Sequence, residues 1–242
     1  MSVQSAADIR RFVPDSDYQE NRYASAMEEQ LRSGDYWLDL GAGTRVHGGW
    51  DTVSEAELAK RARLLIGCDL SKDHMRRNRH LHVAVVAAAT HLPFRNGSIN
   101  MLSANMVVEH LQEPEAVLGE VSRVLAQEGR FVFSTPNRRH PIVWLTALLV
   151  WKHGRQLLAE RIEGRDGEHV FPTFYRFNTG TGIRRGAARA GFAVRSLELF
   201  NSFPFFRRPR LALLIEGLLI RATNLVALRG LRSNIVCCLE KR

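Results

Sequence analysis

The chain has 242 residues, of which 45% are hydrophobic and 24% charged, as is typical of a globular protein with its own core. Its three cysteines (Cys68, Cys237 and Cys238) exclude a disulfide framework, and their spacing predicts no metal site. We find neither an apolar run of about 20 residues nor a basic, apolar leader, so we expect a cytoplasmic protein without a membrane-spanning helix.

The net charge of +9 is concentrated towards the C-terminal end. Residues 203–242 hold eight Lys or Arg and two Glu, which gives 8 − 2 = +6. These charges are interleaved with the apolar stretch LALLIEGLLI (211–220), which suits contact with an anionic membrane surface or an anionic substrate. A nucleic acid is a less favoured partner, because no recognised nucleic-acid-binding module accompanies the charge. The sequence predicts no particular oligomeric state.

In the first half of the chain, strand patterns alternate with helix patterns after a helical N-terminal segment, 1–34. A Ser-x-x-Glu capping box at Ser54 predicts the start of a helix, and a second helix is expected to stop at Gly129. Alternating strands and helices imply a doubly wound α/β sheet with ligands beyond the carboxyl ends of its strands. Short apolar runs typical of buried parallel strands lie at 36–40, 64–70, 82–88, 99–105 and 129–136.

The second half is less regular but contains no repeat and no convincing linker. We therefore expect a single domain, 1–242, with helical or lid-like inserts at 140–177 and 203–232. The adjacent Cys237 and Cys238 lie in a strand pattern and are expected to pack in the core. Helices are predicted at 140–164, 179–192 and 209–228, and strands at 193–200 and 234–240.

The stretch YWLDLGAGTR (36–45) leads a strand into Gly41 and Gly43, a turn common in nucleotide-binding folds. Val46 stands where a dinucleotide fingerprint needs its third glycine, and no Gly-Lys-Ser/Thr of a phosphate-binding loop follows. S-adenosylmethionine has a ribose but no phosphate, so it needs close backbone approach and an acid for its hydroxyls. The two glycines and Asp69, which ends the next strand, offer both.

Over about 34–192 the sequence resembles the class I S-adenosylmethionine-dependent methyltransferases, particularly the group called type 11. The resemblance implies a Rossmann-like, seven-stranded, mostly parallel sheet with an antiparallel last strand, and S-adenosylmethionine as cofactor. The matching segments, in order, are LDLGAGT (38–44), IGCDLS (66–71), HLPFRNGSIN (91–100), NMVVEHL (105–111), EVSRVLAQEGRFVFSTPN (120–137) and RRGAARAGF (184–192).

The resemblance also assigns positions around the cofactor. The glycine loop is expected to face the methionine part, and the residues after the fourth strand to lie near the reacting methyl group. Two departures stand out, since Ala88 replaces an acid that contacts adenine in many relatives, and Arg45 replaces a loop glycine. Adenine is therefore expected to be held by backbone, with weaker binding. The expected cofactor residues are Asp39, Gly41, Ala42, Gly43, Asp69, Leu70, Ala89, Thr90, Asn105 and Met106.

On the acceptor side, His110 is a candidate general base for a hydroxyl nucleophile, although it also suits a purely structural role at the start of a helix. The segments after the fifth strand and before the helix at 179 are expected to hold the acceptor, or else to pack as core loops. Their candidate residues are Arg138, His140, Tyr175 and Arg176.

These observations favour methyl transfer to an oxygen of a small molecule, with a glycan or a lipid-linked intermediate as the preferred acceptor. One alternative is a non-catalytic cofactor-binding protein of the same fold. Another is a nucleic-acid methyltransferase. Many of those carry an Asp/Asn-Pro-Pro-Tyr/Phe motif where this chain has NMVVEH (105–110).

Overall fold

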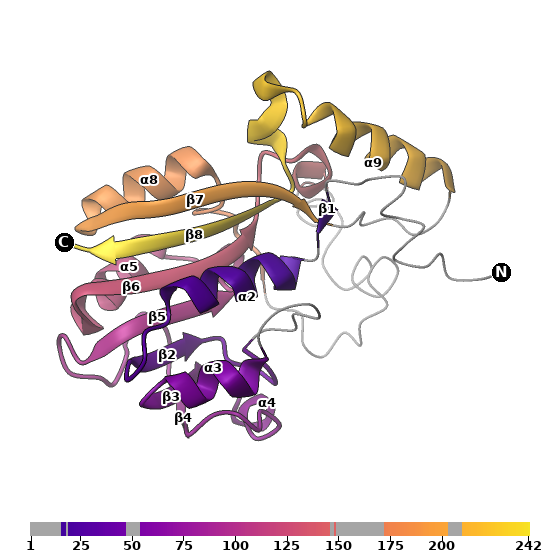
Figure 1. Ribbon diagram of the computed structural model, residues 1–242. Coiled ribbons are helices and arrows are strands. Elements are labelled where there is room, and N and C mark those ends of the chain that lie inside the picture. The colour runs from indigo at the N-terminus through magenta and orange to yellow at the C-terminus, as the bar shows by residue number, and fades with distance from the viewer. Residues whose placement is uncertain (1–15, 18, 47–53, 146–147, 149–171, 203–209) are drawn as a thin grey trace.

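The computed structural model describes residues 16–17, 19–46, 54–145, 148, 172–202 and 210–242 (Figure 1). One sheet of eight strands runs through it, in the order β1-β7-β8-β6-β5-β2-β3-β4. The strands are β1 (Ser16–Asp17), β2 (Tyr36–Leu40), β3 (Leu64–Asp69), β4 (Val83–Val86), β5 (Ile99–Asn105), β6 (Leu125–Pro136), β7 (Phe192–Ser202) and β8 (Asn234–Lys241).

The direction of the strands confirms the predicted Rossmann-like arrangement. Strands β2 to β6 pair in parallel, whereas β8 is antiparallel to both of its neighbours, β6 and β7. The short strand β1 was not predicted, and it extends the sheet by pairing in parallel with β7. The carboxyl ends of strands β2 to β6 therefore all lie along the same side of the sheet, where ligands bind in such folds.

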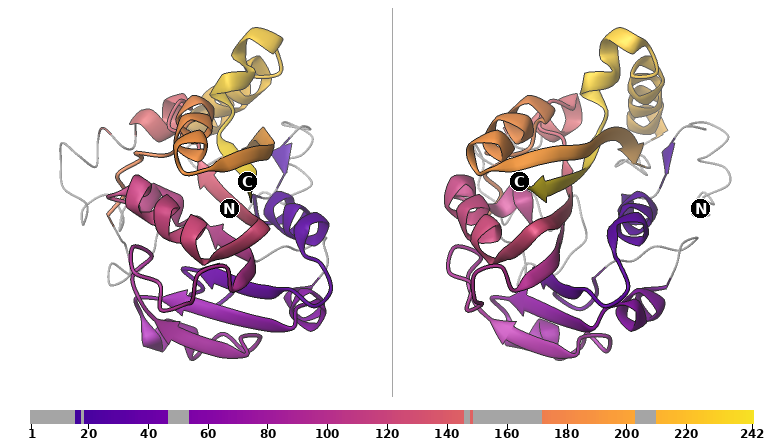
Figure 2. Two further views of the ribbon diagram at one scale, coloured as in Figure 1. Left: turned by 90° about the vertical axis from the view of Figure 1, so that its left-hand side faces the viewer. Right: turned by 60° about the vertical axis from the view of Figure 1, so that its left-hand side comes forward.

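Helices cover both faces of the sheet (Figure 2). Helices α2 and α3 pack on one face, over a buried cluster that contains Trp37 and Leu65, while α5 and α8 cover the other. The central strands contribute apolar side chains to both clusters, because both of their faces are buried. Their sequences are therefore continuously apolar and do not alternate with polar residues. The helices are α2 (Gln19–Gln30), α3 (Glu55–Arg61), α4 (Lys72–Met75), α5 (Pro114–Val124), α8 (Gly180–Arg189) and α9 (Arg210–Ala222), with 3₁₀ turns η1 (Val108–His110) and η4 (Val226–Leu231).

Of the two predicted helix boundaries, the start at Ser54 is confirmed and the stop at Gly129 is wrong. The capping box at Ser54 is present, with the Ser54 hydroxyl accepting from the Glu57 amide at 3.2 Å. The helix predicted to stop at Gly129, however, ends at Val124, and β6 begins at Leu125. Within β6 the register with β5 shifts, and Glu128 there has a φ of 58°. Gly129 fits this irregularity of the strand, because a Cβ there would lie 2.7 Å from the Ala126 carbonyl oxygen.

The predicted inserts lie partly outside the described residues. Of the helix expected over 140–164, residues 141–145 are described as helix, and most of the remainder falls in 149–171. The helix expected over 209–228 is α9, which gives way to η4 after a turn. Of the N-terminal segment, α2 is helical as expected and 1–15 is not described. None of the described helices has the length and hydropathy needed to cross a bilayer.

Candidate active site

The glycine loop forms a tight connection after β2 that only small residues permit. Gly41 and Gly43 have φ values of 67° and 42°, in the left-handed region that glycine adopts without strain. A Cβ on Gly41 would lie 2.4 Å from the Val107 Cγ2 atom, so the loop and the segment after β5 approach each other closely. The Gly41 amide donates to the Cys68 carbonyl at 2.7 Å, and Ala42 is fully buried against β3. The backbone of this loop is thus held in place before any ligand binds.

Asp69 ends β3 directly beside this loop. One carboxylate oxygen accepts from the Gly43 amide at 3.0 Å, and the other accepts from the Ser71 amide at 2.8 Å. A carboxylate has about four lone-pair positions, so both oxygens keep acceptor capacity for the two hydroxyls of a ribose. The structure therefore brings together the glycine turn and the acid that the sequence paired.

Apolar side chains stand exposed around the same edge of the sheet. Leu70 is 63% exposed after β3, Val86 is 56% exposed at the end of β4, and Met106 is 36% exposed after β5. Exposed apolar side chains beside an acid that can accept from ribose hydroxyls are suited to contact the apolar parts of a nucleoside. Ala89 and Thr90 follow β4 at this edge and are half-buried. These residues fit an adenosine cofactor.

Asp39, the acid two positions before Gly41, is buried beneath the loop. The Ser103 hydroxyl donates to its carboxylate, and the Trp37 indole N–H donates to the Ser103 oxygen at 2.7 Å. Burial raises the pKa of Asp39 well above its usual value, and the carboxyls of Glu55 and Asp69 add to the rise, against the Ser103 hydrogen bond. A cationic ligand near the loop would relieve this repulsion. Asp39 is thus buried under the loop, whereas Asp69 lies beside it.

The end of β5 is joined to the N-terminal segment of the chain. The Gln19 side-chain amide donates to the Asn105 Oδ1 atom at 2.6 Å and to the Ser134 hydroxyl oxygen at 2.7 Å. Met106, next along the chain, has a φ of 54° and donates its amide to the Ser134 carbonyl. The backbone at Asn105 and Met106, expected near the reacting methyl group, is therefore fixed by both β6 and α2.

His110 lies at the end of η1, half-buried, and its ring contacts the segment before α8. Its Nδ1 atom is 2.8 Å from the Pro172 carbonyl oxygen. Since a carbonyl oxygen only accepts, Nδ1 carries the proton in this contact, and Nε2 is the nitrogen that can accept one in the neutral ring. This tautomer is the one that a general base needs, and the contact with Pro172 is equally consistent with the structural role.

Glu109, the residue before His110, links three segments of the chain on the side where the acceptor is expected. Its backbone carbonyl accepts from the amides of Phe174 and Tyr175, at 2.7 and 3.1 Å. Its buried carboxylate accepts from the Thr135 hydroxyl at 2.9 Å, and Asn178 donates to the same Thr135 oxygen. Burial raises the pKa of Glu109 to about 7. One residue thus connects η1, β6 and residues 174–178.

Arg138, Tyr175 and Arg176 meet at this same segment. The Arg138 amide donates to the Asn178 carbonyl at 2.9 Å, and its guanidinium lies 3.5 Å from the Tyr175 carbonyl oxygen. Arg176 donates to the Gln112 carbonyl at 2.7 Å and stacks 5.8 Å above the Phe174 ring centroid. Both arginines are exposed. Tyr175 has a φ of 49°, which is unusual for a bulky residue and is held by these contacts.

His140 is the fourth residue expected to contact the acceptor, and it lies deeper than the others. Its side chain is buried, and neither ring nitrogen has a hydrogen-bond partner within the described part of the chain. Burial lowers its pKa to about 4, so the ring is neutral at physiological pH. A buried imidazole without partners can bind a polar atom of a ligand that reaches it. The described residues contain no group of three or more metal-binding side chains.

The residues that the sequence missed are connected over long distances in the chain. Gln19 and Ser134 are separated by 115 positions, and Asn178 and Thr135 by 43. No local pattern marks such pairs, because each belongs to an ordinary helix start, strand or loop. Glu109 had a local signal in the motif NMVVEH, but nothing in the sequence indicates that its carboxyl is buried.

Comparison with known proteins identifies the family. Residues 15–197 match a family described as a methyltransferase domain. Demethylmenaquinone methyltransferase of Corynebacterium kroppenstedtii is 33% identical over 119 residues, which are 48% of this chain and 49% of that protein. The protein of the same description from Mycobacterium sp. (strain KMS) is 34% identical over 110 residues, or 44% and 45% of the two chains. The chain thus spans about half the length of the curated relatives it matches.

Solved structures share the fold over most of the chain. An S-adenosylmethionine-dependent methyltransferase of Mesorhizobium loti matches with a TM-score of 0.57 and 16% identity, covering 92% of this chain and 98% of the other. Geranyl diphosphate C-methyltransferase of Streptomyces coelicolor A3(2) matches with a TM-score of 0.59 and 17% identity, covering 91% and 77%. The [4+2]-cyclase SpnF matches with a TM-score of 0.56 and 15% identity, covering 91% and 81%. At these identities the likeness is one of fold.

Proposed function

The chain belongs to the class I S-adenosylmethionine-dependent methyltransferases, and from this membership we propose that it transfers a methyl group from S-adenosylmethionine to a small, lipid-type acceptor. The observation that carries the proposal is the juxtaposition of the constrained Gly41–Gly43 turn, the Asp69 carboxylate and the exposed Leu70 and Met106 side chains at one edge of the sheet. That arrangement provides a backbone surface, a ribose acceptor and an apolar cover for an adenosine cofactor.

In this proposal the cofactor residues bind and orient, and the acceptor side moves a proton. When bound, S-adenosylmethionine supplies an electrophilic methyl group on a positively charged sulfur. Asp69 accepts from the ribose hydroxyls, and the backbone at Asn105 and Met106 lines the reacting end. For an oxygen acceptor, Nε2 of His110 would take the hydroxyl proton while the oxygen gains the methyl group and the carbon–sulfur bond of the donor breaks. Much of the rate would come from in-line positioning, since the leaving group is already activated.

The nature of the acceptor rests on relatives and on the acceptor-side surface. The names of two similar proteins refer to demethylmenaquinone and geranyl diphosphate, both of which are isoprenoid compounds. Of the two acceptor classes expected from the sequence, they support the lipid-linked one over the glycan. The neutral His140 ring offers a polar anchor inside the fold, and the exposed guanidinium groups of Arg138 and Arg176 suit an anionic group on the acceptor.

Calorimetric titration with S-adenosylhomocysteine tests the cofactor site. We expect micromolar binding by the wild type and at least a tenfold loss in Asp69→Ala, because two charge-assisted hydrogen bonds are removed. Asp73→Ala is the matched control, since Asp73 is an exposed acid on the adjacent α4 and its side chain is 82% exposed. Equal affinity in all three proteins, or no binding by the wild type, would contradict the site.

Transfer of a radiolabelled methyl group tests the reaction and the acceptor. Wild type, Asp69→Ala and His110→Asn are each incubated with labelled S-adenosylmethionine and either a lipid extract or a water-soluble glycan extract. The proposal predicts label in the lipid fraction with the wild type alone, and mass spectrometry then identifies the methylated atom. Label in the glycan extract instead would contradict the lipid-type acceptor and assign a glycan. Cofactor binding without transfer to any extract would favour the non-catalytic alternative.

A further inference from the structure

Helix α9 carries its apolar side chains on the outside of the molecule. Leu211 is 67% exposed, Leu214 46%, Ile215 59% and Leu218 64%. Their spacing of three and four residues places them on one face of the helix, which therefore forms a continuous apolar stripe. Exposed apolar residues scattered singly are normal, but a contiguous stripe marks a surface that contacts something else.

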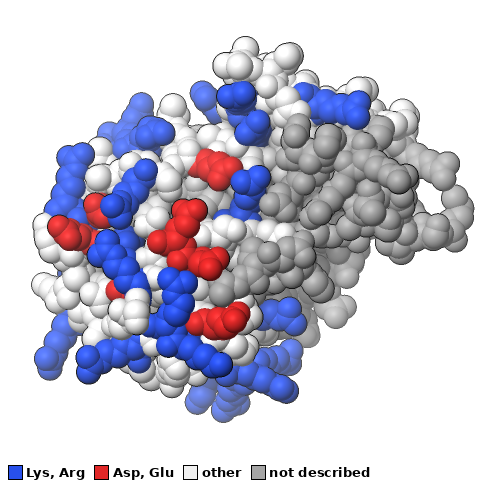
Figure 3. Space-filling view, viewed as in Figure 1, with Lys and Arg blue, Asp and Glu red and all other residues white. Residues whose placement is uncertain are grey.

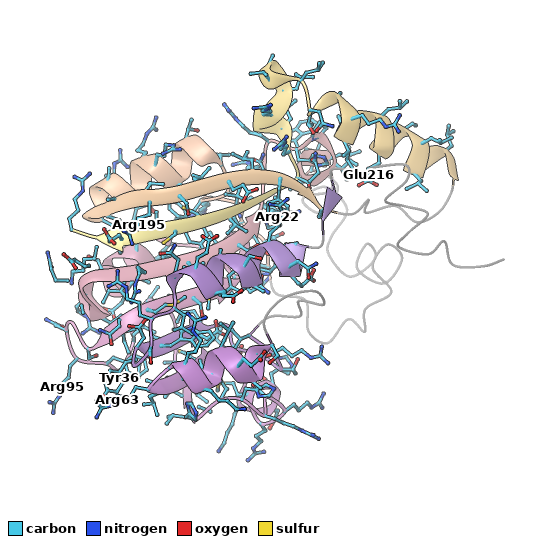
Figure 4. All side chains as sticks on the ribbon, in the orientation of Figure 1. Arg22, Tyr36, Arg63, Arg95, Arg195 and Glu216 are labelled. Atoms are coloured by element: carbon cyan, nitrogen blue, oxygen red, sulfur yellow. The ribbon has the colours of Figure 1, made fainter. Side chains whose placement is uncertain are left out.

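The opposite face of α9 is buried and partly polar. Glu216 is 4% exposed, and Figure 4 shows it on the underside of α9. Thr223, just after the helix, is fully buried, and its hydroxyl oxygen accepts from the Asn201 side-chain amide at 2.8 Å. Leu213 and Ile220 complete this buried face. Specific contacts therefore hold the partly polar face of α9 against the protein, and the stripe of leucines and isoleucine faces outward. In an ordinary surface helix the apolar face is the buried one.

The apolar surface continues past the helix and is flanked by positive charge. Leu225 is 64% exposed and Val226 is 76% exposed at the start of η4. Residues 210–233 contain four arginines and one acid, Glu216, which gives 4 − 1 = +3, and that acid is buried. Figure 3 shows Lys and Arg, but no Asp or Glu, on the part of its visible face that α9 and η4 occupy.

We infer that α9 and η4 form a docking surface for an anionic lipid bilayer, with α9 lying in the plane of the interface. Apolar side chains beside exposed cations are what such an interfacial helix requires, and α9 is too short to cross a bilayer. A second copy of the chain is the weaker occupant. Residues 210–233 present no exposed carboxylate that could pair with the arginines of a second copy.

The inference goes beyond the proposed function and does not depend on it. A lipid-type acceptor held in a bilayer would be reached from this surface, but binding to the bilayer requires neither cofactor nor turnover. Vesicle binding by Asp69→Ala therefore separates the two proposals, because that variant is expected to lose cofactor and keep its affinity for lipid.

The experiment is co-sedimentation of the full chain with vesicles of phosphatidylcholine, with or without about 30% phosphatidylglycerol, in the absence of methyl donor. We expect at least tenfold stronger binding to the anionic vesicles, weakening as salt is raised. Leu214→Glu combined with Leu218→Glu should abolish it. The matched control is Val83→Glu, at a 41% exposed apolar residue on edge strand β4, which should bind like wild type.

Two arginine variants test the electrostatic contribution to vesicle binding. Arg229→Gln, at an exposed position in η4, should weaken binding to anionic vesicles about fivefold, since each basic residue near the surface contributes about a factor of five. Arg95→Gln, at an exposed arginine far from α9 in Figure 4, should have no effect. Thermal unfolding and cofactor affinity equal to wild type establish that each variant is folded.

Two outcomes overturn the inference. One is vesicle binding that the Leu214→Glu/Leu218→Glu variant keeps. The other is no binding to anionic vesicles by the wild type. If the wild type is then a dimer in sedimentation equilibrium that this variant dissociates, the stripe is assigned to a second copy of the chain.

Discussion

Glu109 illustrates how burial alone changes the chemistry of a single residue. Its neighbour His110 keeps a half-buried ring, whereas the Glu109 carboxyl is enclosed between η1 and β6 and accepts from the Thr135 hydroxyl. Burial is the main cause of its raised pKa, and the Thr135 hydrogen bond opposes it in part. The folded protein therefore holds this proton more tightly than the unfolded chain does.

The proton on Glu109 predicts a pH-dependent stability. The folded pKa of Glu109 is about 7, above the unfolded value of about 4.5. The stabilising contribution of the Glu109 proton is therefore fully present below pH 4.5 and is lost as the pH rises through 7. Glu109→Gln keeps an acceptor for Thr135 but cannot ionise. Between pH 4.5 and 8 we expect the free energy of unfolding of the variant, relative to wild type, to rise by on the order of 3 kcal/mol.

Urea unfolding at several pH values measures this difference. Glu115→Gln, at an exposed acid in the first turn of α5, is the control and should run parallel to the wild type above pH 5.5. A constant difference between Glu109→Gln and wild type across the range would show that the Glu109 carboxyl ionises normally in the folded state.

At the scale of elements, Gly41 in the loop after β2 is restricted both by its positive φ and by the nearby Val107 side chain. Gly34, just before β2, has a positive φ alone, so the two effects can be measured separately. Gly41 and Gly34 both have positive φ values, 67° and 85°, but a Cβ meets Val107 only at Gly41 and meets nothing within 4 Å at Gly34. Gly34→Ala should therefore cost only the backbone term, roughly 1–2 kcal/mol. Gly41→Ala adds the clash, so it should be more destabilising and should abolish S-adenosylhomocysteine binding.

A second substitution, at Val107, should relieve the clash of the Gly41→Ala variant. Adding Val107→Ala removes the Cγ2 atom that lies 2.4 Å from the new Cβ, so the double variant should recover part of the stability lost in Gly41→Ala. Thermal unfolding of the single and double variants checks this. Equal losses in Gly34→Ala and Gly41→Ala would mean that the loop moves away from Val107 without cost.

At the scale of the whole molecule, Arg130 in β6 connects four parts of the chain. Its guanidinium donates to the Asp35 carboxylate at 2.8 Å and to the Gln30 carbonyl at 2.6 Å, and it approaches the Asn100 carbonyl at 3.5 Å. Both charged side chains are buried, at 3% and 9% exposure. The end of α2, the start of β2, β5 and β6 are thereby held together at the edge opposite the ligand site.

Breaking this buried pair should be costly, because the remaining partner is left as an unpaired buried charge. We expect Arg130→Met to lower the free energy of unfolding by about 3–5 kcal/mol. The double variant Asp35→Asn/Arg130→Met should lose less than the sum of its single variants. Arg76→Met removes the exposed Arg76–Asp73 pair, with side chains 66% and 82% exposed, and should cost at most about 1 kcal/mol. Similar losses in the two single arginine variants would contradict the buried pair.

Much of the architecture was accessible from the sequence because its signals are local. Continuous apolar runs mark strands that are buried on both faces, and the Ser54–Glu57 capping box marks the start of α3. The order of short motifs led to the family and to the pairing of the glycine turn with Asp69. These features depend on neighbouring residues and on the regular period of helices and strands, so the chain determines them before it folds.

Only the tertiary structure decided which side chains are buried and which distant residues meet. The sequence could not show that Gln19 reaches Asn105 and Ser134, or that the Glu109 carboxyl is enclosed, since both depend on contacts between remote segments. Nor could the LALLIEGLLI pattern show that α9 buries Glu216 and exposes its leucines. An amphipathic period specifies two faces of a helix, but the packing of the remaining chain determines which of them meets solvent.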